Sequence, residues 1–414
     1  MGIEANPIID GLLLQVLATP EGRADPYRYY AEMRQHGRLN RTALGPLLVF
    51  NYDDCLTVLR DPHMGRGVRS SAGALSAYAV GNEGMPEAFV ELSRHNMLLA
   101  DPPDHTRLRQ LVSRSFTPRH IEKLRPAVHQ LVDALLDDLA DGGQVEFMSD
   151  FALPLPMSVI GELVGVPVDE RAILQPYVRA ASKAIEPLLS EEEATEAFEA
   201  YDYLATYFNE LIEQRRRQPR DDLLSGLAQA REKDDHLTTD EVCSTAILLF
   251  AAGFETTTNL LGNGLLALLR QPDQLARWRA QPDLAPTAVE ELLRWDSPVQ
   301  LNMRAALEPI ELAGEPIEAG QEIIVLQGAA NHDPQHFEGA EILDLSRSPN
   351  VPLSFGWGVH HCLGAGLARM EGEIAFNTLL ARFDQIELRT DEPEWRASFT
   401  LRGLLSLPLE LIAA

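Results

Sequence analysis

The feature that most constrains the fold is one long helical pattern over residues 238–270. Thr238 and Glu241 have the spacing of a capping box, in which a threonine caps a helix and a glutamate three residues later bonds back to it. The pattern ends before Pro272, because proline cannot continue a helix. A helix of that length measures about 45–50 Å, enough to cross a whole domain. The rest of the chain is therefore expected to pack around it.

Most of the remaining sequence also has helical spacing. Helices are predicted at residues 27–36, 101–116, 119–141, 192–217, 286–295 and 364–383. Strands are predicted at 47–50 and over 303–325, and residues 399–412 suggest a hairpin with its turn near Arg402 and Gly403. These patterns predict a mainly α fold with minor β structure. No stretch resembles a linker, so residues 1–414 are expected to form a single domain.

The chain is strongly acidic, with a formal net charge of −27. Nucleic acids and anionic membranes bind clustered positive charge, so neither is an expected partner. The longest apolar run, residues 246–253, is too short to span a bilayer, and residues 11–18 are too short for a signal peptide. We therefore expect a soluble, cytoplasmic protein.

Three cysteines, Cys55, Cys243 and Cys362, are too widely spaced for a disulfide framework or a CxxC metal site. Cys362 lies in the stretch FGWGVHHCLG, where two glycines flank a tryptophan and the cysteine precedes a predicted helix. Glycines permit tight turns and the close approach of a flat ligand. The positive end of a helix dipole favours the thiolate, the form in which cysteine binds metals. A buried, inert cysteine is the alternative interpretation.

This stretch resembles the haem-binding signature of the cytochrome P450 family, F-G-x-G-x-H-x-C-x-G, at each fixed position from Phe355 to Gly364. The resemblance implies the cytochrome P450 fold, with the long helix over haem b and a small sheet region. It assigns Phe355 to cofactor binding and Cys362 to ligation of the haem iron. A thiolate ligand promotes O–O bond cleavage. Further family motifs follow in the expected order from about residue 25 to the C-terminus, which disfavours the inert cysteine.

A second match is the ELLR stretch that joins Glu291 and Arg294 on one helix face. Such pairs are common on solvated helices and carry little information alone. In the family the pair is buried and meets a second arginine, for which Arg347 is the candidate. The resemblance therefore implies that Glu291, Arg294 and Arg347 form a structural trio on the proximal side of the haem pocket, where loss of one partner would be costly.

A third match is AGFETT, residues 252–257, which resembles the oxygen-binding motif A-G-x-[DE]-T in the long helix. Ala252, Gly253 and Thr256 share a helical face, and the small side chains would let that face lie close above a macrocycle. The Thr256 hydroxyl can bond to the carbonyl four residues earlier and leave a groove for oxygen and water. Glu255 and Thr256 are the predicted catalytic residues, because together they would relay protons. A plain core helix is the alternative.

A fourth match, DPPDHTRLR at residues 101–109, resembles a motif whose histidine and arginine hold the haem propionates. Asp101 is expected to cap this helix, with His105 and Arg109 one turn apart on one face. Bonds from histidine and arginine to carboxylates are charge-assisted. The resemblance adds Arg304 and His360 as further propionate contacts, with ordinary surface charge as the alternative for Arg304.

The resemblance implies a monooxygenase that inserts one oxygen atom of O2 into a substrate by hydroxylation or epoxidation. The sequence contains no flavin, nicotinamide or iron–sulfur motif, so ferredoxin and ferredoxin reductase are the expected electron donors. A positive patch for an acidic ferredoxin would comprise Arg107, Arg109, Arg114 and Arg369, although scattered surface arginines explain them nearly as well. Two alternatives stay open: a haem-thiolate enzyme that uses peroxide, and a non-catalytic haem protein for storage or gas sensing.

Substrate contacts in the family come from segments that are here residues 65–97, 178–206, 299–301 and 399–404. These segments are rich in Leu, Ala and Val, so the expected substrate is an apolar or amphipathic small molecule. The candidate contacts are Ala252, Val299, Gln300 and Leu301. Gln300 and Arg402 are candidates for a polar anchor, unless they serve only the backbone.

Overall fold

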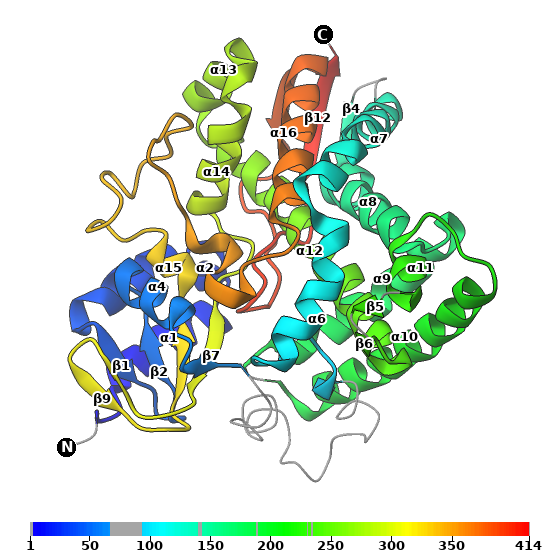
Figure 1. Ribbon diagram of the computed structural model, residues 1–414. Helices are drawn as coiled ribbons and strands as arrows, with labels where there is room; N and C mark the ends of the chain where they lie inside the picture. The colour runs from blue at the N-terminus through cyan, green and yellow to red at the C-terminus, as the bar shows by residue number, and fades with distance from the viewer. Residues whose placement is uncertain are drawn as a thin grey trace. The chain divides into compact units, whose positions relative to one another are not determined.

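The computed structural model describes residues 3–66, 93–139, 143–187, 189–229, 231–232 and 235–413. The chain divides into two compact units that interleave along the sequence (Figure 1). Unit 1 comprises Met1–Met64, Leu124–Leu155 and Thr256–Ala414, and unit 2 comprises Gly65–Lys123 and Pro156–Glu255. Helices dominate and the sheets are small, which confirms the predicted mainly α fold with minor β structure.

The helices and strands have the following bounds. The α-helices are α1 (Pro7–Ala18), α2 (Pro20–Ala24), α3 (Tyr27–Met33), α4 (Tyr52–Arg60), α6 (Asp104–Ser113), α7 (Pro118–Asp137), α8 (Pro154–Val164), α9 (Val168–Ser182), α10 (Glu191–Arg217), α11 (Leu223–Gln229), α12 (Thr239–Leu269), α13 (Pro272–Ala280), α14 (Ala285–Trp295), α15 (Gln327–Ala330) and α16 (Ala365–Arg382). The strands are β1 (Leu39–Arg41), β2 (Leu47–Val49), β3 (Met64–Gly65), β4 (Gly143–Glu146), β5 (Arg231–Glu232), β6 (Asp235–His236), β7 (Asn302–Ala306), β8 (Ile310–Leu312), β9 (Glu315–Ile317), β10 (Glu322–Val325), β11 (Phe383–Leu388) and β12 (Pro408–Ala413).

The predicted long helix is α12, and its capping box is present. The backbone N–H of Glu241 donates to the Thr238 hydroxyl at 3.2 Å, and the backbone N–H of Thr238 donates to the Glu241 carboxylate at 2.8 Å. The predicted cap at Asp101 is wrong, because α6 has Pro103 at its N-cap position and begins only at Asp104. The Asp101 carboxylate instead accepts the backbone N–H of Arg66 at 2.7 Å.

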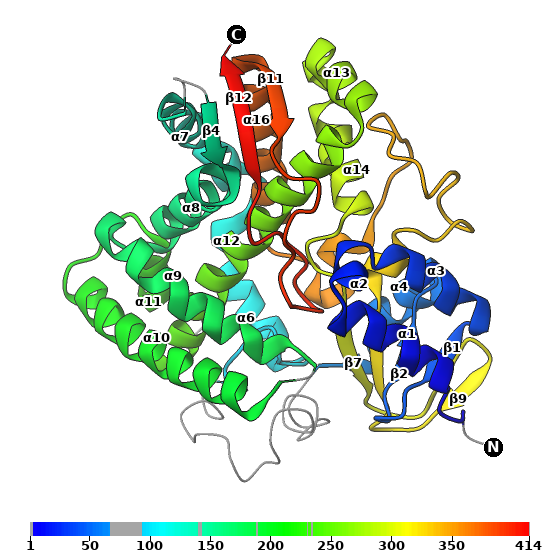
Figure 2. The same cartoon turned by 180° about the vertical axis from the view of Figure 1, so that it is seen from behind.

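In unit 2, α9 and α10 pack against each other (Figure 2). The rings of Tyr177 and Tyr203 are stacked, with their centres 3.8 Å apart. A second capping box fixes the start of α10, since Ser190 and Glu193 bond reciprocally. The sequence patterns did not predict α8 or α9. Both helices contain or begin with prolines, which weaken a helical signal in sequence, but Pro154 stands at the start of α8, where a proline is tolerated.

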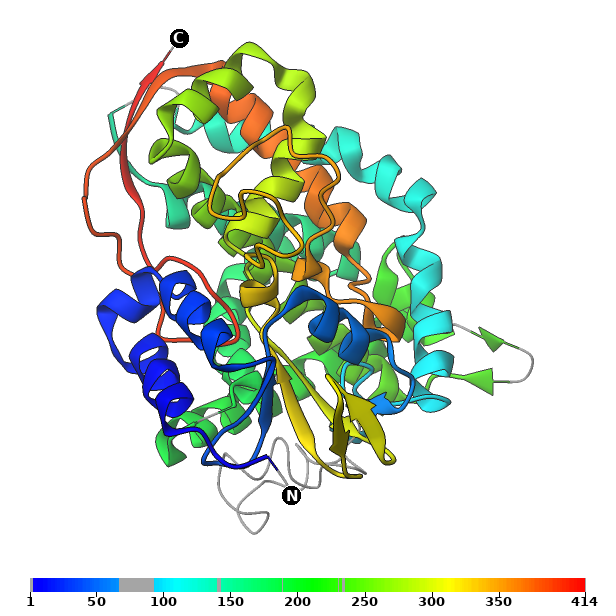
Figure 3. The same ribbon diagram turned by 90° about the vertical axis from the view of Figure 1, so that its left-hand side faces the viewer.

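The main sheet belongs to unit 1 and has the strand order β1-β2-β10-β7-β3. β2 and β10 are parallel, with Leu47 opposite Ile323, whereas β1–β2 and β10–β7 are antiparallel. Leu47 and Val49 pack into a core cluster that includes α4 residues, and Leu48 packs into another that includes α1 and α3 residues. Helices therefore cover both faces of the sheet, which explains why β2 is buried along its length (Figure 3).

The predicted hairpin over residues 399–412 is wrong. β12 pairs with β11 and β4, while residues 400–402 run beside residues 298–300. The backbone N–H of Gln300 donates to the Thr400 carbonyl at 2.9 Å, and that of Arg402 donates to the Pro298 carbonyl at 2.9 Å. Tertiary pairing with a distant segment thus replaces the local turn that the Arg402–Gly403 pair suggested.

No single helix in the part of the chain that the structure describes is both long and apolar enough to cross a bilayer. The bent pair Met148–Val164 and Val168–Ile185 reaches the required length and hydropathy when its two helices are taken together.

Candidate active site

Cys362 lies in the loop between a short 3-10 turn, Gly358–His360, and the start of α16. It is exposed, whereas Cys55 and Cys243 are buried. Burial raises the pKa of the Cys243 thiol to about 12 and that of Cys55 well above its usual range, so both remain thiols. Cys362 alone combines exposure with a position next to a helix N-terminus, which favours a metal-binding thiolate.

Two glycines shape this loop for different reasons. Gly356 and Gly358 have φ of 63° and 70°, a region that other residues rarely adopt. A Cβ on Gly358 would also overlap the carbonyl oxygen of Leu59 at the end of α4, so the loop rests directly on that helix. A Cβ on Gly356 would meet nothing nearer than Asn302 Nδ2 at 4.0 Å. The loop is therefore anchored on α4 at Gly358 and has open space around Gly356.

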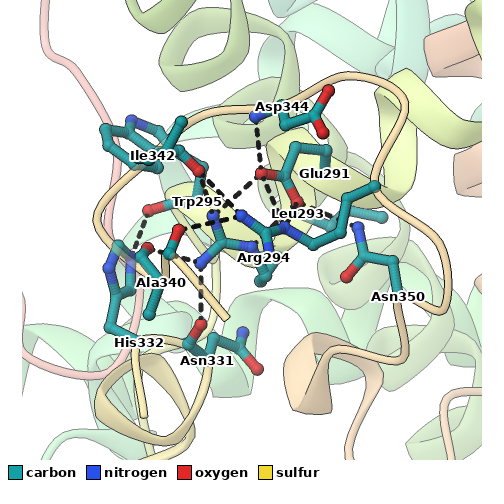
Figure 4. Close-up of polar contacts among 12 residues, drawn as sticks. Glu291, Leu293, Arg294, Trp295, Asn331, His332, Ala340, Ile342, Asp344 and Asn350 are labelled. Carbon is teal, nitrogen blue, oxygen red and sulfur yellow. Dashed lines mark hydrogen bonds and ion pairs between the residues drawn. The ribbon is translucent and has the colours of Figure 1, made fainter. Parts of the chain in front are cut away.

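The trio of Glu291, Arg294 and Arg347 is assembled in unit 1 (Figure 4 labels the first two). Arg294 donates to both oxygens of Glu291 at 2.8 Å, with no exposed side-chain area on either residue. Arg347 Nε lies 3.1 Å from Glu291 Oε2. The same carboxylate accepts from the backbone N–H of Asp344 at 2.9 Å and from Asn350 Nδ2 at 3.0 Å. A buried charge with this many donors is well compensated.

Asn331 connects the trio to the cysteine loop. Arg294 Nη1 donates to the Asn331 carbonyl at 2.9 Å. The Asn331 carboxamide accepts the backbone N–H of Leu353 at 2.7 Å and donates to the Ser354 hydroxyl at 2.8 Å. Leu353 and Ser354 form the turn that enters the loop, and the Cys362 N–H closes the loop on the Phe355 carbonyl at 2.9 Å. These hydrogen bonds, together with the chain from Leu353 to Phe355, connect α14 to the thiol loop.

Sequence reasoning assigned no role to Asn331. Its only local signal is its place before His332 in the stretch NHDP, residues 331–334. His332, like Asn331, contacts residues that are distant in the sequence. Its Nε2 lies 2.8 Å from the Trp295 carbonyl, and its ring stacks on that of Tyr27 with 4.1 Å between the ring centres. Burial, and then the charge of Arg294, lowers the pKa of His332 to about 3. The ring is therefore neutral and donates to the carbonyl.

The oxygen-motif residues lie in the middle of α12. Glu255 is buried, Thr256 is half-buried and Ala252 is exposed. A Cβ on Gly253 would overlap the side chain of Ile160 in α8. Packing within unit 2 therefore supplies a reason for this glycine beside the predicted close approach of a macrocycle. Ala252 marks an open face on a helix that is otherwise mostly buried.

The candidate propionate contacts are divided between the units. His105 is 1% exposed and Arg109 half-buried in α6 of unit 2. Arg304 on β7 is 4% exposed and His360 half-buried in the cysteine loop of unit 1. One guanidinium nitrogen of Arg304 donates to the Met303 carbonyl at 2.8 Å. Arginine and histidine side chains suit the carboxylates of an anionic porphyrin, and a thiol suits its iron.

The candidate substrate residues fall into two groups. Val299 is half-buried and Leu301 buried beside the 400–402 segment. Gln300 is 2% exposed, and its amide nitrogen donates to the Tyr27 hydroxyl at 3.1 Å and the Ser297 carbonyl at 2.7 Å. That nitrogen is thus engaged within the protein. Most of the predicted segment 65–97 lies outside the described residues.

Two of the four arginines proposed as a docking patch are paired with carboxylates. Arg107 forms an ion pair with Glu241, and Arg369 forms one with Glu290. The Arg369 guanidinium also lies 4.5 Å from the centre of the Phe355 ring. These arginines contribute to packing as well as to surface charge.

Comparisons with known proteins agree with this geometry. The family model for cytochrome P450 matches residues 183–412. The polyketide biosynthesis cytochrome P450 PksS of Bacillus subtilis is 43% identical, with 88% of each chain covered. The 6-deoxyerythronolide B hydroxylase of Saccharopolyspora erythraea is 38% identical over 94% of this chain and 96% of its own.

A solved structure extends the similarity to the fold. P450BioI, in complex with an acyl carrier protein that carries hexadec-9Z-enoic acid, superposes with a TM-score of 0.88 at 37% identity, covering 95% of this chain and 99% of that one. The chain therefore belongs to the cytochrome P450 family, and as a member of it is a monooxygenase that binds haem b.

Proposed function

We propose that this chain hydroxylates or epoxidises an apolar small molecule with O2, using electrons from a ferredoxin and a ferredoxin reductase. The observation that carries the proposal is the exposed Cys362, held at the start of α16 by a loop that hydrogen bonds tie to the buried Glu291 network. The motifs fall in both units, which supports residues 1–414 acting as one catalytic domain. None of the three cysteines, all among the described residues, is in a disulfide, which suits a reducing compartment, so we place the enzyme in the cytoplasm.

The residues that would hold the haem have distinct tasks. Cys362 would ligate the iron, and Phe355 would pack beside the ring. Arg304 and His360, with His105 and Arg109, would bind the propionates through charge-assisted bonds. Thiolate-ligated haem, when bound, supplies the activation of O2.

The protein's own contribution to the chemistry is proton control on α12. The buried Glu255 carboxyl is the candidate donor of a proton beside the helix face that Thr256 and Ala252 share. The Thr256 hydroxyl can accept that proton and pass it on, because a hydroxyl both donates and accepts. This acid–alcohol pair favours reductive oxygen activation over direct use of peroxide and over a storage or sensing role.

The proposed substrate is an apolar, acyl-derived molecule. The side chains of Ala252, Val299 and Leu301 are apolar, which suits an aliphatic chain or a macrocycle. The names of the relatives point the same way, since one belongs to polyketide biosynthesis, one hydroxylates a deoxyerythronolide and one is seen with a fatty acyl carrier protein. Gln300 would shape the substrate site through its backbone, because its side-chain amide nitrogen is engaged with Tyr27 and Ser297.

The proposed electron donor is an acidic iron–sulfur protein. Because the net charge is −27, an acidic partner needs a local positive region to dock. Arg114 is exposed after α6, and Arg109 precedes it on that helix, while Arg107 and Arg369 are partly neutralised by Glu241 and Glu290. The candidate docking residues are Arg107, Arg109, Arg114 and Arg369.

The deciding experiment is the absorption spectrum of the dithionite-reduced protein with and without carbon monoxide. We expect a strongly red-shifted Soret band, the sign of a thiolate ligand, and we expect Cys362→Ala to abolish it. Cys243→Ala is the matched control and should keep the band. A wild-type band typical of histidine ligation would refute the assignment. Turnover that proceeds with hydrogen peroxide but not with ferredoxin, reductase and NADPH would select the peroxide-using alternative.

A further inference from the structure

Two of the proposed substrate segments form one structural element in unit 1. Residues 298–300 and 400–402 run antiparallel and exchange two backbone hydrogen bonds, from Gln300 N to the Thr400 carbonyl and from Arg402 N to the Pro298 carbonyl, each of 2.9 Å. Val299 and Leu401 face each other across this pairing. The two segments are therefore a short ribbon and not two independent loops.

The two faces of the ribbon differ in chemistry. Residues directly opposite in an antiparallel pair share a face, so Val299 and Leu401 lie on one side, and Gln300 and Arg402 lie on the other. Gln300 is 2% exposed and Arg402 is 7% exposed. The polar face is thus turned into the protein, while on the apolar face Leu401 is 8% exposed and Val299 is half-buried.

Arg402 binds the polar face to three parts of unit 1. Its Nε donates to Asp296 Oδ1 at 2.5 Å, just after α14. Its terminal nitrogens donate to the carbonyls of Arg23 and Ala24, at the end of α2. Its guanidinium also lies 3.6 Å from the centre of the Trp395 ring. The Arg402 side chain therefore joins the ribbon to the end of α14, the end of α2 and the segment around Trp395.

Neighbouring groups hold the arrangement from both sides. The Tyr27 hydroxyl donates to Asp296 at 2.8 Å and accepts from Gln300 at 3.1 Å. From α12, Asn263 Nδ2 donates to the Arg402 carbonyl at 3.1 Å. A Cβ on Gly403 would overlap the carboxamide of Asn259, so the chain passes directly against α12. The ribbon is fixed between α12 and the N-terminal helices.

We infer that Arg402 is a positioning residue that sets the place of the Val299–Leu401 face, and is not an anchor for the substrate. The inference rests on the proposed function, in which Val299 contacts the substrate. The Arg402 guanidinium donates to the Asp296 carboxylate and to the carbonyls of residues 23 and 24. Arg402 also lies on the opposite face of the ribbon from Val299. Loss of the side chain should loosen the wall and change which ligands fit, without releasing haem.

The test compares Arg402→Met and Arg402→Lys with the wild type, and uses Arg389→Met as a matched control at an exposed arginine. Hydrogen–deuterium exchange of peptides that cover residues 298–303 and 399–404 should rise about tenfold in Arg402→Met, because exchange reports local opening. Arg402→Lys keeps a charge opposite Asp296 but lacks the planar fork, so we expect an intermediate increase. Arg389→Met should exchange like the wild type.

A second readout uses two haem-iron ligands of different size, imidazole and phenylimidazole, titrated by the Soret band. Imidazole should bind Arg402→Met with a dissociation constant close to that of the wild type. The dissociation constant of phenylimidazole should change about fivefold or more, since only the larger ligand reaches the wall. Asn263→Ala should move both readouts in the same direction by less, and serves if Arg402→Met does not fold.

The outcomes separate the inference from the proposed function. Unchanged exchange in Arg402→Met, or raised exchange with an unchanged ratio of the two dissociation constants, would overturn the positioning role. A changed ratio without a change in exchange would mean that Arg402 contacts the ligand directly. A wild-type protein whose Soret band does not respond to imidazole would refute the proposed function itself.

Discussion

Unit 1 contains two buried arginine–carboxylate clusters, and they are built in opposite ways. Glu291 and Arg294 are three residues apart on α14 and have no exposed side-chain area. Asp296 and Arg402 are 106 residues apart, and their side chains keep 11% and 7% exposure. The first cluster is local in sequence and supports the cysteine loop, and the second joins distant segments and supports the ribbon. Similar chemistry therefore supports the cysteine loop in one place and the proposed ligand-facing ribbon in the other.

The largest expected effect comes from breaking the local cluster with Arg294→Met. Glu291 would keep Arg347 but lose its bidentate partner, and the bonds to the Asn331 and Ala340 carbonyls would also go. We expect the free energy of unfolding to fall by about 3–5 kcal/mol, the usual result of leaving a charge buried without its partner. Urea unfolding followed by circular dichroism measures it.

Arg382→Met is the control, since Arg382 pairs with Asp137 on the surface. Surface pairs contribute about 0–1 kcal/mol, so this variant should unfold almost like the wild type. An equal loss in both variants would mean that burial of the Glu291 cluster carries no special weight.

A smaller effect is expected at the backing of the second cluster, with Gly403→Ala. The new Cβ would overlap the Asn259 carboxamide, and we expect a loss of about 1–3 kcal/mol from overpacking. Adding Asn259→Ala should remove most of that loss, which a double-mutant cycle detects. As a control, Gly11→Ala has open space around its Cβ and should be neutral or stabilising. Strictly additive effects at residues 403 and 259 would contradict the close packing.

A pH dependence that develops gradually is expected at His332, which touches both clusters through Trp295 and Tyr27. Burial lowers its pKa from 6.5 to about 3 in the folded state. Between pH 6.5 and pH 3, His332 therefore binds a proton in the unfolded chain but not in the folded protein. The stability that the neutral, buried ring gives the folded protein is complete above pH 6.5 and is lost as the pH falls toward 3. The expected slope approaches about 1.4 kcal/mol per pH unit.

Unfolding free energies of the wild type and His332→Gln between pH 7 and 4 test this, because glutamine can still donate to the Trp295 carbonyl. In the variant, the free energy of unfolding should change less steeply with pH, by up to about 1.4 kcal/mol per pH unit, because one titrating group is missing. Parallel curves for the two proteins would show that His332 titrates normally in the folded state.

These clusters also show what the sequence could predict. The ExxR pair and the FGWGVHHCLG stretch are local patterns, so family, cofactor and fold class follow from residues that are close together in the chain. α12 was equally accessible, because a capping box and a long apolar period determine it.

The rest depends on contacts between distant segments. Arg402 gave no local sign that Asp296 would bind it, and the turn chemistry of Arg402 and Gly403 suggested a hairpin that pairing with residues 298–300 replaces. Asn331 binds through both its backbone and its carboxamide to partners tens of residues away. Gly253 has a packing reason in Ile160 that no helical period reveals.

The parallel pairing of β2 with β10 has a consequence for folding during synthesis of the chain. Leu47 lies opposite Ile323, so β2 leaves the ribosome long before the strand that pairs with it exists. At ordinary translation speeds of about 5–20 residues per second, that wait lasts roughly 15–55 s. During that time, the edge of Leu47–Val49 that later pairs with β10 is an apolar strand edge with unpaired backbone hydrogen-bonding groups. Exposed edges of this kind promote aggregation. Production of this enzyme in a foreign host should therefore respond more to slower synthesis and added chaperones than to any change at the haem site.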